Sequence, residues 1–428
     1  MSVTETTSGI SFGLSDEQRA LRQLAREFAA KEIRPVAADY DERSEHPVDV
    51  IAKAHEVGLV NPHIPEEYGG LGLSAFEQIL IGEELAWGCS GIATSIVANI
   101  LGSLPVLLAG SDEQKREWLP PLLEQPLLCS FALTEPGAGS DVSAIQTTAE
   151  LRDGDYVLNG SKMFITNAGQ AAWFVVFASS DREAGHQGLS AFVVPAESEG
   201  VVVEQHLDKL GQRATDTSAL AFHEVRVPAA NRLGEEGEGF KIAMRTLDLT
   251  RPGTAAGAVG VARAAFEHAI EYSKSRVQFG QPIAINQGVN FLVADMAAEI
   301  EAARLLTWQA AWLIDQGERA TLQSSYAKRF AADTAMKVTT DAVQIFGGYG
   351  YMKEYPVEKL MRDAKLFQIY EGTSQIQRLV IAREIFLPRD SWRSSRHSSR
   401  TRVERSRRHV GATSSGRRRK RRLVPRDS

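Results

Sequence analysis

The feature that most limits the fold of this sequence is a change in the spacing of its apolar residues, which occurs twice along the chain. Before residue 130, apolar residues recur at helical spacing, as in LSDEQRALRQLAREFAAKEI. From about 130 to 235 the chain breaks into short runs rich in β-branched and aromatic residues, such as WFVVFASS. From Gly239 onward, long Ala-rich segments return to helical spacing and suggest a helical bundle. The sequence therefore predicts the order α, β, α.

Two local patterns support this division. Ser15 followed by Gln18 has the form of a capping box, which predicts a helix beginning just after Ser15. The stretch RDGD at 152–155 lies between two β-type runs and predicts a tight hairpin. We therefore expect helix caps in the first part of the chain and hairpins in the second.

Composition excludes some classes of protein. The 428 residues, 43% hydrophobic and 24% charged, are enough for several domains with a large core. We find no apolar run typical of a membrane span and no targeting pattern at the N-terminus. The two cysteines, Cys89 and Cys129, lie far apart and no HExxH pair occurs, so we expect a reduced, cytoplasmic protein without a metal site.

Charge is unevenly distributed. Residues 388–428 contain 15 Lys and Arg against 3 Asp and Glu, a balance of +12. The rest of the chain must then carry −18 to give the total of −6. The basic, Ser-rich tail is nearly free of apolar residues, so we expect it to be disordered.

Two glycine-bearing or polar stretches of the β region could bind a ligand. FALTEPGAGSDVSA, at 131–144, places glycines among hydroxyl and carboxyl groups, and its backbone N–H groups could cradle an anion. A flexible surface loop explains this stretch about equally well. In KMFITNAG, at 162–169, Phe164 could cover an aromatic ring and Thr166 could hydrogen-bond to it. Neither a GxGxxG fingerprint nor a P-loop is present, so a nucleotide cofactor must be held in another way.

The helical regions contain two further candidates. Glu371, in YEGTSQIQR, stands between an aromatic residue and a glycine just before an apolar-periodic segment. By itself it could be a solvated Glu at a helix start, or a base held at a fixed point in a pocket. Asp248 and Arg251, three residues apart, could form an exposed ion pair or bind a ligand.

Taken together, these motifs resemble one family, the flavin-dependent acyl-CoA dehydrogenases. Five segments match its pattern in order and spacing: TEPGAGSD, KMFITN, RVQFGQPI, QIFGGYGY and IYEGTSQIQRL. The resemblance covers about residues 12–387 and looks closest to the medium-chain enzymes. It implies an α+β fold with a helical N-terminal domain (1–129), a central β-barrel-like domain (130–237) and a C-terminal four-helix bundle (238–387). The tail, 388–428, has no counterpart in the family.

The resemblance also implies an FAD cofactor and the residues that hold it. One set would surround the flavin: Phe131, Leu133, Thr134, Gly139, Ser140, Phe164, Ile165, Thr166, Thr373 and Gln375. A second set would contact the FAD of a neighbouring subunit: Arg276, Phe279, Gln287, Gln344, Ile345, Phe346, Gly347 and Gly348. This sharing requires an oligomer, and the family implies a homotetramer built as a dimer of dimers.

The matched positions imply a reaction as well. Glu371 would remove the α-proton of a fatty acyl-CoA while the β-hydrogen leaves as hydride to flavin N5, giving a trans-2-enoyl-CoA. The substrate would contact Ser140, Asp248, Arg251, Tyr370 and Gly372. Some relatives carry the base beside the Arg of the LDLTRP segment, but Thr250 occupies that position here and cannot serve. Electrons would pass to electron-transferring flavoprotein in fatty acid β-oxidation.

The chain departs from the family pattern inside the site. Phe164 replaces the Trp that most relatives carry, which leaves an aromatic cover of different size. Ala93 and Val97 stand where medium-chain relatives carry polar residues, so a more apolar pocket floor could admit other chain lengths.

Two other functions remain open at this stage. An acyl-CoA oxidase that uses O₂ would carry the same motifs, although such oxidases are usually larger. The cluster GRRRKRR could bind nucleic acid or an anionic membrane surface, but we favour an extension without a selected role.

Overall fold

The structure is a computed structural model, and it describes residues 13–387. The described residues fall into two compact units, one ending at Arg378 and the other beginning at Leu379. The second unit contains only the last turns of the final helix within the described range. The basic tail, predicted to be disordered, lies outside the described residues.

The first part of the chain is helical, as its apolar spacing predicts. Ser15 caps the first helix and exchanges hydrogen bonds with Gln18, so the predicted capping box is present. Ser74 and Ser111 begin two later helices in the same way. The helices are α1 (Asp16–Phe28), α2 (Ala37–Arg43), α3 (Val48–Glu56), α4 (Ala75–Gly88), α5 (Ser90–Ala109), α6 (Asp112–Trp118) and α7 (Pro121–Glu124).

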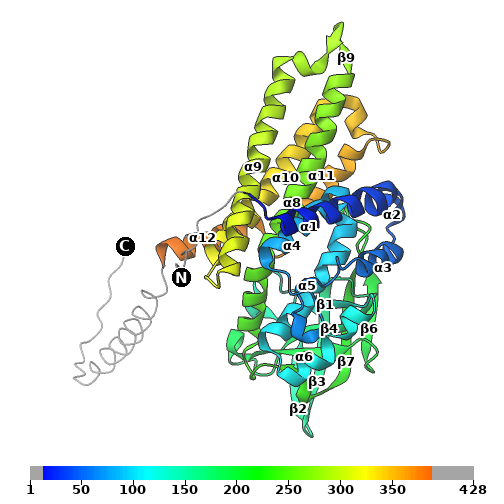
Figure 1. The fold of residues 1–428 in the computed structure, drawn as a ribbon. Helices are drawn as coiled ribbons and strands as arrows, with labels where there is room; N and C mark the ends of the chain where they lie inside the picture. Colours follow the sequence, from blue (N-terminus) through cyan, green and yellow to red (C-terminus); the bar gives the residue numbers. More distant parts are fainter. Residues whose placement is uncertain (1–12, 388–428) are drawn as a thin grey trace, which may run out of the picture. The chain divides into compact units, whose positions relative to one another are not determined.

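The middle of the chain forms one mixed eight-stranded sheet (Figure 1). Its strands are β1 (Leu128–Ala132), β2 (Thr148–Arg152), β3 (Asp155–Thr166), β4 (Ala171–Ser179), β5 (Leu189–Pro195), β6 (Val201–His206), β7 (Thr217–Pro228) and β8 (Arg232–Leu233). The strand order is β6-β7-β3-β2-β4-β5-β8, and β1 pairs with β4 in parallel. The predicted hairpin at 152–155 joins β2 to β3, with Asp153 and Gly154 both at positive φ.

The last part of the chain returns to helices: α8 (Gly239–Ser275), α9 (Gln287–Asp315), α10 (Thr321–Phe346), α11 (Pro356–Phe367) and α12 (Ser374–Phe386). A short hairpin, β9 (Val277–Gln278) and β10 (Gln281–Pro282), joins α8 to α9. Figure 1 places β9 at the end of the long helices farthest from the sheet. The helical, sheet and helical order of the predicted fold is therefore confirmed.

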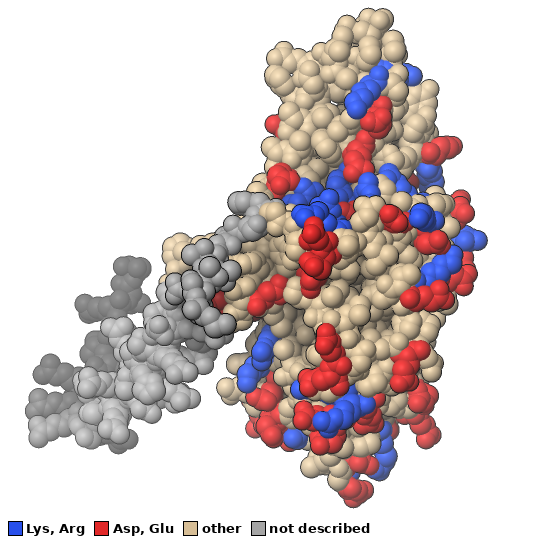
Figure 2. Space-filling model, viewed as in Figure 1, with Lys and Arg blue, Asp and Glu red and all other residues tan. Residues whose placement is uncertain are grey.

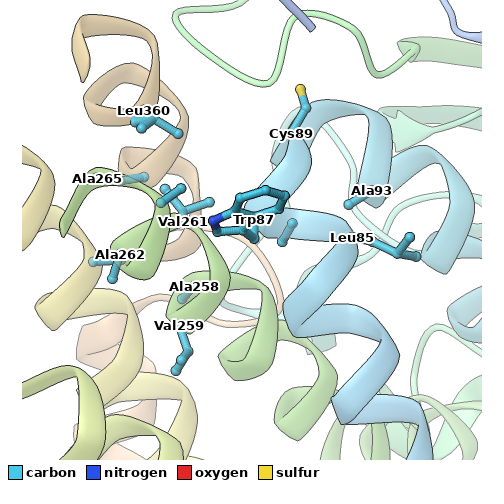
Figure 3. Close-up of a cluster of buried hydrophobic side chains, with 14 of the residues drawn as sticks. Leu85, Trp87, Cys89, Ala93, Ala258, Val259, Val261, Ala262, Ala265 and Leu360 are labelled. Carbon is cyan, nitrogen blue, oxygen red and sulfur yellow. The ribbon is translucent and has the colours of Figure 1, made fainter. Parts of the chain in front are cut away.

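The largest core lies where α4 and α5 pack against α8. Figure 3 shows Leu85 and Trp87 on one side of this core and small side chains such as Ala258 and Ala262 on the other. Small residues let the helix backbones approach closely: a Cβ added at Gly260 would lie 2.3 Å from the carbonyl oxygen of Glu83. This contact fixes α8 against the N-terminal helices.

Helix α5 bears on the expectation that the chain has no membrane span. Of the described residues, only Ser90–Ala109 is long and apolar enough to cross a membrane, judged by length and composition. Half of its most apolar stretch is buried inside the fold. Core helices commonly pass the same test, so α5 is weak evidence for a span.

Candidate active site

The loop between α11 and α12 holds Glu371 in an unusual backbone conformation. Glu371 has φ +51° and Gly372 has φ +87°, both in the left-handed region that non-glycine residues rarely adopt. The turn directs the Glu371 side chain toward α8, where the Thr250 hydroxyl donates a hydrogen bond to Glu371 Oε2 at 2.9 Å. The predicted base therefore faces the helix that carries Asp248 and Arg251.

The surroundings of Glu371 change its acidity. Its side chain is partly exposed, yet enough protein surrounds the carboxyl that burial raises its pKa. Hydrogen bonds from Thr250 and Thr254 oppose this rise, as do the charges of Lys328 and Arg251. The net effect is a pKa above the usual value, which suits a carboxylate that must accept a proton.

Two side chains fix the backbone of this loop. The carbonyl oxygen of Gly372 accepts hydrogen bonds from Lys328 Nζ at 2.6 Å and from Gln377 Nε2 at 3.0 Å. The same Gln377 amide also donates to the carbonyl of Glu371 at 3.2 Å. Among residues 13–387, no acceptor is bonded to the backbone N–H of Glu371. That N–H is therefore available to a ligand.

Asp333 on α10 ties together the two ends of the loop. Its Oδ1 accepts hydrogen bonds from Gln368 and Ser374, each at 2.9 Å, and its Oδ2 accepts one from Arg378 at 2.8 Å. Beside it lies a pocket of about 430 Å³, lined by Asp333, Lys365, Gln368, Ile369, Thr373, Ser374, Gln375 and Arg378. The predicted cofactor residues Thr373 and Gln375 thus line a cavity next to the loop.

In the sheet domain, the fold brings the two predicted ligand-binding stretches together. Ser130 Oγ donates to the carbonyl of Thr166 at 2.7 Å. The N–H of Met163 donates to the carbonyl of Thr134 at 2.8 Å. The segment around Phe131, Leu133 and Thr134 therefore lies directly beside Phe164, Ile165 and Thr166, although about thirty residues separate them in the sequence.

A buried ion pair stabilises the contact between these two segments. Lys162 is fully buried, and its Nζ lies 2.8 Å from Glu135 Oε1 and donates to the carbonyls of Leu133 and Phe177. Burial lowers the pKa of Lys162 to about 8, while Glu135 opposes the decrease. Because either charge would be strongly destabilising if it were buried without its partner, the pair fixes the loop that follows β1.

Phe164 presents an exposed aromatic ring from an unusual backbone conformation. It sits at an irregularity in the pairing of β3 with β7, with φ +62°, and 63% of its surface is exposed. An exposed aromatic ring on a strained backbone is unfavourable unless something covers it. A Cβ added at Gly137 or Gly139 would meet no atom within 4 Å, so the neighbouring loop borders open space.

The second predicted cofactor set gathers at the other end of α8. A pocket of about 420 Å³ is lined by Tyr272, Arg276, Gln278, Ile283, Ile345, Phe346, Gly347, Gly348, Tyr349 and Met352. Arg276 lies over the Tyr349 ring, 5.3 Å from its centroid. Phe279, at the tip of the hairpin, is 97% exposed with φ +51°. Gln344 and Gln287 lie near the end of α10 and at the start of α9.

The two predicted cofactor sets are far apart within one chain. Thr250, which contacts Glu371, and Arg276 are separated by most of α8, and the helical rise of 1.5 Å per residue puts them about 40 Å apart. One cofactor molecule cannot span that distance. If the FAD of one chain lies beside the Glu371 loop, the second set of that chain can reach only an FAD bound to another chain.

The predicted substrate residues have different surroundings. Arg251 is 4% exposed and lies 2.6 Å from Asp248 Oδ1, so the two form an ion pair on the inner side of α8. Thr321 also donates to Asp248. A Cβ at Gly372 would lie 3.8 Å from Arg251 Nη2. Ser140 lies exposed in the loop after β1, and its ligand contacts remain a prediction.

Four residues around the loop were not predicted from the sequence: Lys328, Asp333, Gln377 and Thr254. Lys328 and Asp333 lie in an Ala-rich helix. Charged residues in such a helix are normally solvated, so the sequence gave no sign that these two side chains are buried or partly buried. Gln377 and Thr254 do lie in segments that were singled out or close to them. Only the spatial proximity of α8, α10 and the loop reveals their contacts. Within residues 13–387, no cluster of three metal-ligating side chains occurs.

Comparisons with known proteins agree with this arrangement. Family models described as the acyl-CoA dehydrogenase N-terminal, middle and C-terminal domains match residues 15–126, 130–225 and 237–386. An acyl-CoA dehydrogenase of Bacillus subtilis is 46% identical over 372 residues, 86% of this chain and 98% of the relative. A probable medium-chain specific mitochondrial acyl-CoA dehydrogenase of Caenorhabditis briggsae is 42% identical over 88% of this chain and 92% of its own length. The butyryl-CoA dehydrogenase structure from Megasphaera elsdenii superposes with a TM-score of 0.86 at 44% identity, covering 88% of this chain and all of that one.

Fold, loops and relatives define a flavoprotein oxidoreductase. The chain belongs to the acyl-CoA dehydrogenase family, and its cofactor is FAD.

The residues present fit that cofactor. Phe131 and the exposed Phe164 offer aromatic surface, and Thr134, Ser140 and Thr166 offer hydroxyl groups in the same two segments. Open space borders Gly137 and Gly139, where backbone N–H groups could face an anion. The position of the flavin against Phe164 and Thr166 stays a prediction from the sequence.

Proposed function

We propose that the chain oxidises a fatty acyl-CoA to the trans-2-enoyl-CoA, with Glu371 as the base that removes the α-proton. The observation that carries this proposal is the Glu371 loop: a carboxylate on a left-handed turn, opposite α8, with a pKa raised by burial. A carboxylate near its ordinary pKa of about 4.3 is a weak base, so the rise favours proton abstraction at working pH. Bound FAD supplies the acceptor for the hydride that leaves the β-carbon.

The same loop can stabilise the charge that develops on the substrate. An α-proton becomes acidic only when the thioester carbonyl is polarised, because negative charge moves onto its oxygen. The N–H of Glu371, which no described residue accepts from, is a fixed donor for that oxygen. Thr250 keeps the carboxylate oriented while the proton moves.

Replacing the base tests this assignment. Glu371→Gln keeps the side-chain size and the backbone donor but cannot accept a proton, so we expect turnover to fall at least ~10³-fold. FAD content and acyl-CoA binding should stay close to wild type. The matched control is Glu354→Gln, an exposed carboxylate elsewhere in the chain, which should leave turnover unchanged. Near wild-type turnover in Glu371→Gln would refute the assignment.

For the substrate we propose short- to medium-chain acyl-CoA. Relatives named for butyryl-CoA and for medium-chain substrates are both more than 40% identical to this chain. Ala93 is buried on α5 and Val97 packs at the edge of the same core, so both present apolar surface there. Anaerobic flavin bleaching with a panel from C4 to C16 measures the preference. Bleaching by C16 alone would contradict the proposal.

For the electron acceptor we propose electron-transferring flavoprotein, which would place the reaction in fatty acid β-oxidation. The support is family membership, and an oxidase is the alternative. Steady-state turnover with electron-transferring flavoprotein under argon should exceed turnover in air without it. Stoichiometric hydrogen peroxide from acyl-CoA and O₂ alone would favour the oxidase.

We also propose a homotetramer built as a dimer of dimers. The support is the separation of the two cofactor sets along α8, together with the exposed apolar side chains Val277, Phe279, Ile285 and Tyr351 near the hairpin. Figure 2 shows few charged side chains on the visible face at this end of the helices. Such a surface is suited to contact with another chain.

A further inference from the structure

We propose that Lys328 is a positioning residue for proton abstraction: its ammonium group holds the Gly372 carbonyl and thereby fixes the Glu371 loop, and its charge favours the ionised form of Glu371. This inference rests on the proposed role of Glu371 as base.

The contact is short and shielded from water. Lys328 lies in the first third of α10 with no exposed surface, and its Nζ is 2.6 Å from the Gly372 oxygen. Gln377 donates to the same oxygen from the opposite end of the loop. Two donors on one carbonyl define the plane of the peptide that follows Gly372. The Gln377 amide also donates to the Glu371 carbonyl, so Lys328 and Gln377 together fix both peptides that follow Glu371.

The burial of Lys328 points to a partner charge. A buried ammonium is costly unless an opposite charge and hydrogen bonds offset its desolvation. Its described hydrogen-bond acceptor is a neutral carbonyl, and one such bond does not offset the loss of water around a full charge. The carboxylate whose charge acts most strongly on Lys328 is Glu371. The cation and the base therefore stabilise each other's charged forms.

Other charged groups around the pair come from three elements. Helix α8 contributes Arg251 and its partner Asp248, α10 contributes Asp333 with Arg329, and α12 contributes Arg378. Burial lowers the pKa of Lys328 to about 8, while Glu371 and Asp333 raise it and Arg251 lowers it further. Lys328 is thus mainly an ammonium at pH 7, and it loses its charge as the pH rises through about 8.

The charge of Lys328 affects the pKa of Glu371. A cation beside a carboxylate lowers the carboxylate's pKa, so Lys328 opposes the rise caused by burial. Removing the cation should raise the pKa of Glu371. Because the base acts in its ionised form, the acidic limb of the kcat profile should move to higher pH.

Two substitutions separate the hydrogen bond from the charge. Lys328→Met removes both, and we expect kcat to fall about 10- to 100-fold, as small misplacements of reacting groups do, with KM nearly unchanged. Its acidic limb should move up by about one pH unit. Lys328→Gln keeps an N–H donor without a charge. It should recover part of kcat at high pH but show the same shift of the limb. Lys337→Met, on the exposed side of the same helix, is the control.

A second readout does not depend on turnover. Exchange of the α-proton of the acyl-CoA in D₂O, followed by mass spectrometry under anaerobic conditions, reports proton abstraction alone. We expect exchange in Lys328→Met to be slower and its acidic limb to be shifted in the same direction. FAD content and thermal midpoint, measured on the same samples, report any structural damage.

The outcomes are distinct. An unshifted acidic limb and wild-type exchange in Lys328→Met overturn the inference, and so does a loss of stability alone with both properties intact. If Lys328→Met does not fold, the acidic limb of the kcat profile of Lys328→Gln is the deciding measurement, and an unshifted limb overturns the inference. Exchange at the wild-type rate in Glu371→Gln would instead show that Glu371 is not the base, which is a failure of the proposed function.

Discussion

At the residue scale, the site depends on two successive residues with left-handed backbones. Gly372 has φ +87°, and a Cβ there would lie 2.8 Å from Gln377 Nε2, the amide that holds the loop. Glycine is therefore required for two reasons, conformation and space. The positive φ of Glu371 is a strained conformation for a non-glycine residue, and it is the conformation that directs the side chain toward α8.

This requirement gives a prediction. Gly372→Ala should displace the Gln377 amide and reduce kcat at least tenfold, because the carboxylate and its N–H move together. Gly317→Ala is the matched control: Gly317 also has positive φ, at +71°, but a Cβ there meets nothing within 4 Å. Both variants should lose about 1–2 kcal/mol of stability from backbone strain, measured by urea unfolding. Equal kcat values in the two variants would contradict the prediction.

The sequence predicted the residues of the loop better than the residues that support it. Glu371 and Gly372 lie in a short motif that can be read directly. Lys328 contacts Gly372 across 44 residues of chain, and its helix gives no local sign that one lysine faces inward. Long-range contacts of this kind depend on how helices pack, which the apolar spacing of a single segment does not determine.

At the scale of elements, the position of α8 is set by close packing against α4. Gly260 is the tightest point, since an added Cβ would lie 2.3 Å from the Glu83 oxygen and 2.9 Å from the Trp87 nitrogen. Both are backbone atoms and cannot move without moving α4. Glu83 and Glu84, buried on the same helix, pair with Arg263 and Arg304 and fix the register of the contact.

We therefore expect Gly260→Ala to separate α4 from α8 and to destabilise the protein by about 2 kcal/mol or more, as overpacking does. Gly288→Ala, in helix α9 with open space at the Cβ position, should be neutral or slightly stabilising, because alanine favours helix. Thermal unfolding of the FAD-bound protein compares the two. A Gly260→Ala midpoint equal to that of wild type would show that the helices can adjust.

The sequence predicted which segments form helices and strands, but not which of these elements lie next to each other in the fold. The helix cap at Ser15 and the hairpin at 152–155 follow from residues close in sequence, and both are present. The parallel pairing of β1 with β4 is different, because it joins segments about forty residues apart. The runs around Phe131 and Phe174 are apolar enough to pair with several strands, so composition alone leaves the partner undetermined.

At the scale of the whole molecule, the proposed sharing of FAD between subunits can be tested by complementation. Phe164→Ser should weaken the set that holds the chain's own flavin, and Phe279→Ser the set that reaches a neighbour's. Each variant alone should lose bound FAD and activity. In a mixed dimer, one site carries both defects and the other carries none, so co-expression should restore activity to a substantial fraction of wild type.

The control is a mixture of Phe164→Ser with Leu151→Ser, an exposed apolar residue on β2 that belongs to neither set. There the Phe164→Ser half stays defective, and activity should simply follow the proportion of intact chains. FAD content, read from absorbance near 450 nm relative to protein, provides a second measure. Failure of the first pair to exceed either parent would mean that each site is built within one chain.

Helix α8 connects the Glu371 contact to the second predicted cofactor set. The helix runs unbroken for 37 residues, with the Glu371 contact in its first half and Arg276 directly after its end. The length of the helix therefore sets both the distance and the relative rotation between these two points. One residue inserted between them would turn the far end by about 100° and advance it by about 1.5 Å, while both local motifs stayed intact. The proposed sharing of FAD between subunits therefore constrains the number of residues in this helix, even where the side chains along it could be exchanged.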